Sequence, residues 1–135
     1  MGKSLGQDVG TGRWIPEPAY NTLAATATGS ATAAGAVATF NLPAGSRALI
    51  LRVYVTNEGT GGASSYALEA AGSAVVPYYL PSAGELIDSG SLKEPVAFIA
   101  NTTTSSIPVG IYALSVASGN TVRAAVTYMI MPDWR

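Results

Sequence analysis

Few side chains in this sequence could support catalysis or metal binding. The chain has no histidine and no cysteine, which excludes Ser–His–Asp and Cys–His nucleophiles and removes the usual nitrogen and sulfur ligands of zinc. The closest carboxylates are Glu85 and Asp88, in the stretch PSAGELIDSG. Two carboxylates can hydrolyse a glycosidic bond, and their oxygens can bind Ca²⁺. A solvated loop that carries two acidic residues is the simpler interpretation.

Other short motifs lack the context that their chemistry needs. Ser89 and Lys93 have the wrong spacing for a Ser–Lys dyad, and the glycine-rich runs DVGTG and NEGTGG lack the lysine of a phosphate-binding loop. Asn101 begins a glycosylation acceptor triplet, but no secretory signal accompanies it, so we interpret it as part of a polar loop. We therefore expect a protein without catalytic activity, cofactor or metal site.

Composition narrows the classes of partner. Charged residues make up 11% of the chain, against about 25% in a typical soluble domain, while apolar residues make up 48%. Either the surface is rich in Ser, Thr, Asn and Gly, or much of it contacts other protein, and both can hold. The net charge is −1 without any basic run, so we expect no nucleic-acid binding. No stretch reaches the roughly 18 apolar residues of a membrane span, and we expect no membrane association.

The elements that must position these residues are strands. Runs of six to eleven residues rich in Val, Ile, Tyr, Phe and Thr recur, and each ends at Gly, Pro, Asn or Ser. We expect eight strands and an all-β fold, a β-sandwich of the jelly-roll type. We also expect a sheet-edge hairpin around Gly29 and Ser30, with a disordered linker as the alternative. The expected strands are residues 21–28, 35–42, 47–56, 64–71, 73–80, 95–100, 108–116 and 121–131.

Alternation within these runs predicts the core. In the run RALILRVYVT, residues 47–56, the odd positions from 49 to 55 are all large apolar residues while the even positions are mixed, as in a strand with one buried face. The same period of two appears in TVRAAVTYMIM, residues 121–131. The predicted core comprises Leu49, Leu51, Val53, Val55, Phe40, Phe98, Ile111, Val126 and Tyr128.

The stretch GRWIPEPAYN, residues 12–21, cannot belong to a helix or a central strand. Two prolines within three residues remove backbone donors and hold the chain extended. The large apolar residues around them would each gain about 1.5–3 kcal/mol from burial, so we expect them to dock on a neighbouring subunit or a capsid, or to fold back as a lid. The residues that carry this prediction are Trp14, Ile15, Pro16, Pro18 and Tyr20.

This reasoning divides the chain into an extended N-terminal arm, residues 1–20, and a sandwich domain, residues 21–135. Trp134 follows the last strand in another proline-containing setting and is a further interaction candidate. Arg52 and Arg123 lie in the middle of strands on the mixed face, where a charge must reach water or a carboxylate. They are either solvent-exposed or paired with a carboxylate of another subunit, such as Glu58, Glu69 or Glu94.

From Arg47 onward the chain resembles the small virion proteins of tailed bacteriophages, especially head decoration (cement) and auxiliary proteins. The passages that carry the resemblance are VVPYYLPSAGELIDSG, SLKEPVAFIAN and IPVGIYALSVASGNTVRAAVTYMIMPDWR. They combine short Ala/Val/Tyr strands, Ser/Gly/Asn turns, few charges and no cysteine. The resemblance covers about two thirds of the chain.

The resemblance implies a non-enzymatic jelly-roll subunit, commonly a homotrimer, made in the host cytoplasm and placed on the capsid surface of the virion. Its partner would be the major capsid protein or another virion protein. Two alternatives remain open at this point. A carbohydrate- or receptor-binding β-sandwich would need several exposed aromatics together, whereas the two tryptophans, Trp14 and Trp134, lie near opposite ends of the chain. A tail or neck subunit shares the same sequence features.

Overall fold

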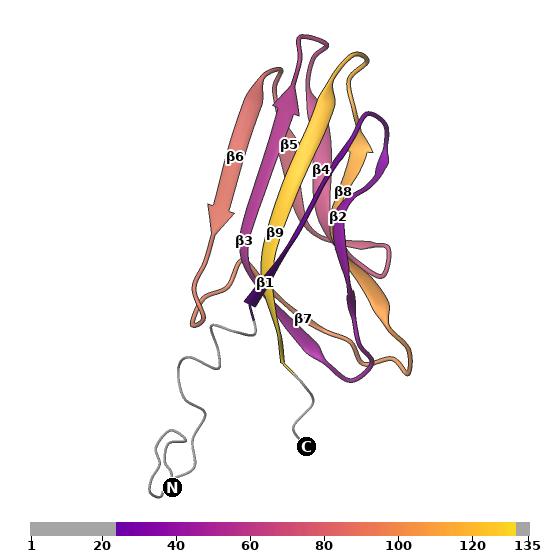
Figure 1. The fold of residues 1–135 in the computed structure, drawn as a ribbon, viewed down its shortest axis with the longest axis vertical. Helices are drawn as coiled ribbons and strands as arrows, with labels where there is room; N and C mark the ends of the chain where they lie inside the picture. Colours follow the sequence, from indigo (N-terminus) through magenta and orange to yellow (C-terminus); the bar gives the residue numbers. More distant parts are fainter. Residues whose placement is uncertain (1–23, 132–135) are drawn as a thin grey trace, which may run out of the picture.

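The structure, a computed structural model, describes residues 24–131 and forms two antiparallel sheets packed face to face (Figure 1). The prediction of an all-β sandwich is therefore confirmed. No helix occurs in this part of the chain, and so none long and apolar enough to cross a membrane. The expected arm, with Trp14, Ile15, Pro16, Pro18 and Tyr20, lies outside the described residues, as does Trp134.

The first sheet, called sheet A here, contains five of the nine strands. Its order is β1-β9-β3-β6, and β7 pairs with the part of β3 that β6 leaves free. Sheet B has the order β2-β8-β4-β5. The strands of sheet A are β1 (Ala24–Ala31), β3 (Arg47–Glu58), β6 (Gly84–Ser89), β7 (Ala97–Ala100) and β9 (Thr121–Met131); those of sheet B are β2 (Gly35–Leu42), β4 (Ser64–Ala70), β5 (Ser73–Leu80) and β8 (Ile107–Ser115).

The strand missing from the sequence prediction is β6. Its six residues, GELIDS, lie between turn-forming residues and resemble a continuous loop in the sequence. In the structure they alternate, with Leu86 and Asp88 half-buried and Glu85 and Ile87 exposed. Pairing with β3 holds this short segment in the sheet. Tertiary pairing thus decided an element for which local composition favoured a turn.

The predicted hairpin at Gly29 and Ser30 is wrong. Both residues lie within β1, the chain turns after Ala31, and β1 and β2 belong to different sheets. Gly29 serves a different purpose, because a Cβ there would collide with the backbone carbonyl of Val37 in β2. The glycine allows the two sheets to approach closely along this edge of the sandwich.

A bulge in β3 corrects the predicted core. The register against β9 shifts between Ile50 and Arg52, so even positions face the core before the bulge and odd positions face it afterwards. Leu49 is buried, as predicted, but it lies on the outer face and not in the cluster between the sheets, and Leu51 is only half-buried. Phe98 pairs with Leu49 and lies on the same outer face, 55% exposed.

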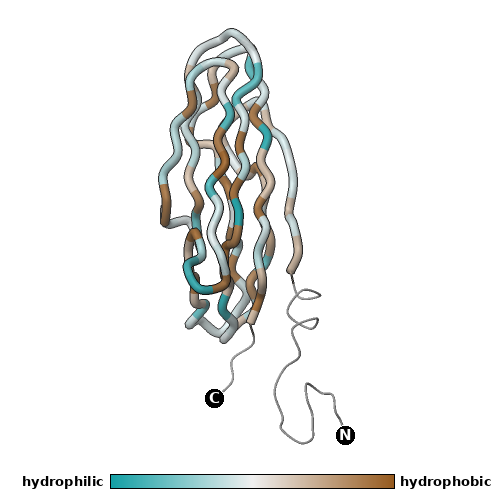
Figure 2. The backbone as a smooth tube through the Cα atoms, turned by 90° about the vertical axis from the view of Figure 1, so that its left-hand side faces the viewer, coloured by the Kyte–Doolittle hydropathy of each residue, from teal (hydrophilic) through white to brown (hydrophobic). Residues whose placement is uncertain are grey.

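The remaining core predictions hold. Phe40, Val53, Val55, Ile111 and Val126 are buried in one cluster between the sheets. Tyr128 packs against this cluster, and its ring stacks on Phe40 of the opposite sheet at a centroid distance of 3.6 Å. Apolar and polar residues alternate along the strands, as Figure 2 shows.

Candidate interaction surfaces

Polar side chains gather on the outer face of sheet A, where Arg123 and Glu58 form an ion pair. The Arg123 Nε donates to Oε2 of Glu58 at 3.0 Å and to Oε1 at 3.1 Å, and Thr56 Oγ1 donates to Oε2 at 3.0 Å. The hydrogen bond from Arg123 lowers the pKa of Glu58, and the one from Thr56 adds to the effect. This pair, considered above as a contact between subunits, forms within one chain.

Tyr54 links a second set of groups on the same face. Its hydroxyl donates to Glu85 Oε2 at 2.6 Å, and this hydrogen bond to a carboxylate raises the pKa of Tyr54. The Arg52 guanidinium lies 5.8 Å from the centre of the Tyr54 ring, a cation–π contact. Arg52 makes no ion pair with any residue from 24 to 131. It is therefore a surface cation without a carboxylate partner in the described part of the chain.

The two carboxylates considered for catalysis do not form a catalytic pair. Glu85 faces outward to Tyr54, whereas Asp88 faces inward and accepts a hydrogen bond from Tyr78 Oη at 2.9 Å. Burial, and to a lesser extent the bond to Asp88, raise the pKa of Tyr78. In residues 24–131 no three acidic side chains come close enough to hold a metal ion.

Two open hollows mark the surface. One, of about 320 Å³, lies between β1 and the Tyr54–Arg123 region. Its single cation, Arg123, is bonded through Nε to Glu58, which offsets its charge.

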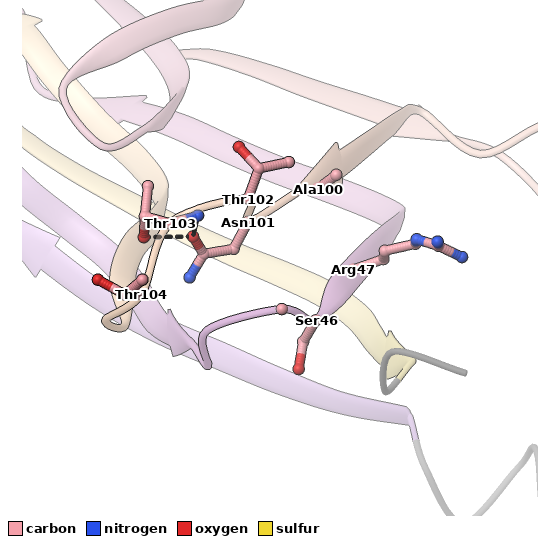
Figure 3. Close-up of a pocket in the computed structure, with 8 residues that line it drawn as sticks. Ser46, Arg47, Ala100, Asn101, Thr102, Thr103 and Thr104 are labelled. Carbon is pink, nitrogen blue, oxygen red and sulfur yellow. Dashed lines mark hydrogen bonds between the residues drawn. The ribbon is translucent and has the colours of Figure 1, made fainter. Parts of the chain in front are cut away.

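The second hollow, of about 440 Å³, lies beside the loop that follows β7 (Figure 3). Asn101, buried at its base, donates from Nδ2 to the carbonyls of Leu42 and Ser105, at 2.9 Å each. Its Oδ1 accepts from the backbone and the hydroxyl of Thr103. Both Nδ2 and Oδ1 of Asn101 are thus bonded within the chain, and these hydrogen bonds hold the loop after β7 in place.

Large apolar side chains exposed in the described residues fall into two groups. Patch A follows the β6–β7 edge of sheet A, and patch B lies on the outer face of sheet B. Local sequence patterns do not identify this set, because the β3 bulge and the β6 pairing decide which residues face outward. Patch A consists of Ile87, Leu92 and Phe98, and patch B of Val75, Tyr79 and Leu114.

Charge separates the two sheets. The four strands of sheet B contain one charged residue, Glu69, which lies on the outer face beside the covered Ala67. Glu69 is half-buried and makes no ion pair with any described residue. The strands of sheet A contain six charged residues, namely Arg47, Arg52, Glu58, Glu85, Asp88 and Arg123. Sheet B thus has a wide, nearly uncharged outer face.

Comparison with known proteins identifies no family for this chain. No protein-family model matches the chain, and no curated protein matches it. Among solved structures, a chain described as "Cyanophage Pam1 capsid asymmetric unit" is similar with a TM-score of 0.34 and 19% identity, over 78% of this chain and 84% of that chain. A similarity this distant carries no inference about function, which is argued below from the residues of this chain.

Proposed function

We propose that this chain is a non-enzymatic structural protein of a virion, specifically a capsid decoration (cement) protein that stabilises the head through contacts between subunits. The observation that carries the proposal is the outer face of sheet B, where one charge lies among Tyr, Leu, Val, Pro and Ala side chains and neutral polar ones such as Thr39 and Asn41. A soluble monomer ordinarily covers such a face with charged residues, and an uncovered apolar area usually marks a protein contact. The sequence resemblance to small virion proteins points the same way.

We further propose that the sandwich is a jelly roll. The strand pairs are nested, since β1 pairs with β9, β2 with β8 and β4 with β5, while β6 and β7 together occupy one position beside β3. Counted as one interrupted strand, β6 and β7 reduce nine strands to eight. The nested order then corresponds to a long hairpin rolled into two four-stranded sheets, which supports the jelly-roll interpretation.

The outer surface favours this proposal over a carbohydrate-binding module. Sugars stack on aromatic rings that share one surface. The two strongly exposed aromatic residues of the described chain are Tyr79 on sheet B and Phe98 on sheet A, so they face away from each other. They cannot form one stacking platform.

The test is binding to capsids. The purified protein, mixed with intact capsids of the phage that encodes it, should sediment with them saturably and at a copy number set by the lattice symmetry. Deletion of residues 1–19 should leave far-UV circular dichroism nearly unchanged and weaken the binding, if the arm grips the capsid. Binding to isolated tails and not to heads would replace the proposal with the tail or neck alternative. Binding that a free glycan displaces would favour receptor recognition.

A further inference from the structure

Two opposite charges on opposite faces of the sandwich lack partners in the described chain. Arg52 projects from sheet A, where its guanidinium lies 5.8 Å from the centre of the Tyr54 ring. Glu69 projects from sheet B, half-buried and without an ion pair. A carboxylate without a cation beside it gains from acquiring one in an interface, and a cation on an exposed face can supply it.

Each of these charges adjoins one of the apolar patches. On sheet A, Arg52 pairs with Ser89 of β6, and Ile87 of patch A lies on the same strand, opposite Tyr54. On sheet B, Glu69 pairs with Ala74 of β5, next to Val75 of patch B. Each site therefore combines exposed apolar area with one charge, and the two charges have opposite signs.

The two patches flank one edge of the sandwich. Strands β5 and β6 follow one another in the chain and are the edge strands of sheets B and A on the same side (Figure 1). Patch A and patch B thus lie on opposite faces beside a shared edge. In a head-to-tail contact, patch A of one copy faces patch B of the next copy. If each copy is related to the next by a rotation about an axis near that edge, the copies close into a ring.

Direct strand pairing at this edge is blocked. Pro77 lies in the middle of β5 and has no backbone donor. The neighbouring edge is interrupted between β6 and β7, where the loop folds back and the nitrogens of Gly90 and Val96 donate to β3 carbonyls at 2.8 Å each. Both features prevent the addition of another strand. The contact must then use side chains on the faces next to the edge.

We propose that a second copy of this chain covers these surfaces, with patch A of one subunit on patch B of the next and Arg52 beside Glu69 of that next subunit. The contact is heterologous and closes a ring around the β5–β6 edge, which fits the homotrimer that the sequence resemblance implies. The inference rests on the contacts between subunits in the proposed function, and it does not depend on capsid binding.

Charge reversal tests the contact, with sedimentation of the full-length protein as the measurement. Arg52→Glu and Glu69→Arg should each weaken self-association at least tenfold, because each places like charges together in the interface. The double variant restores opposite charges and should regain most of the affinity. Each variant has a matched control at the far edge of its own sheet. Thr26 lies in the same cross-strand row as Arg52, and Thr39 lies in the same row as Glu69. Thr26→Glu and Thr39→Arg therefore introduce the same charges away from the proposed contact and should leave self-association unchanged.

Apolar truncations give a second, independent measurement. Tyr79→Ser and Phe98→Ser should each weaken association while circular dichroism stays unchanged, because both side chains are exposed in the subunit.

Specific results would overturn the inference. A wild-type protein that sediments as a monomer at high micromolar concentration refutes it, as do single reversals that leave association unchanged or a double variant weaker than both. All of these experiments are done without capsids. If the protein forms a ring but does not bind heads, the proposed decoration function is refuted and the proposed contact between copies stands.

Discussion

The outer faces of sheets A and B differ in how their polar groups are satisfied, although both sheets contribute to one apolar core. On sheet A, carboxylates accept hydrogen bonds from other side chains of the chain, as Glu58 does from Arg123 and Glu85 from Tyr54. On sheet B, small and aromatic residues surround one carboxylate, Glu69. The inner faces must match in shape to pack, whereas the outer faces are free to differ, and the less polar one is better suited to meet protein.

The largest expected effect comes from the shared interior. Val53→Asp in sheet A and Leu68→Asp in sheet B both place a charge at a fully buried site, at a cost of about 5 kcal/mol, which is comparable to the whole stability of a small domain. Neither variant should yield soluble folded protein. The control Thr39→Asp, on the exposed outer face of sheet B, should express normally. Folded protein from either core variant would show that the inner faces are not equivalent.

A buried amide that joins the two sheets gives the next largest effect. Asn57, at the end of β3, donates from Nδ2 to the carbonyls of Gly62 at 2.8 Å and Pro81 at 3.0 Å, and its Oδ1 accepts from Asn120 and Ser64. Asn57→Leu removes these four hydrogen bonds and leaves the buried Ser64 hydroxyl without its acceptor, so it should lower the free energy of unfolding by about 3 kcal/mol. Chemical denaturation measures the loss.

Asn41→Leu is the matched control for this change. Asn41 is exposed in β2, so its replacement should alter stability little. Equal losses in the two variants would contradict the role of Asn57 as a link between the sheets.

The smallest effect concerns the ion pair on sheet A. Arg123→Gln removes the main donor to Glu58, so the pKa of Glu58 should rise toward its ordinary value of 4.5, which an NMR titration measures directly. Because the folded pKa is lowered, the pair contributes stability above pH 4.5 that is lost as the pH falls through the folded pKa. Global stability near neutral pH should change little, since the pair is exposed. An unchanged Glu58 pKa would show that the pair does not persist in solution.

Much of the fold follows from local patterns, and the exceptions have physical causes. The period of two identified Val53, Val55 and Val126 as core residues, because strands expose alternate faces. It failed at Leu51 and Phe98, and it did not predict that the buried Leu49 lies on the outer face, since one extra residue in β3 reverses the faces on one side of the bulge. Such a bulge depends on the partner strands and leaves no local signature.

By itself, the sequence determined an all-β sandwich with little charge and without histidine or cysteine chemistry, because composition and strand periodicity are local properties of the chain. The tertiary structure alone decided that Gly29 serves a close approach of two sheets, that residues 84–89 form a strand, and that Arg123 bonds to Glu58. It also decided which apolar residues share a surface, since patches A and B gather side chains from distant segments. Contacts between segments far apart in the chain depend on pairing and register, which no single run of residues specifies.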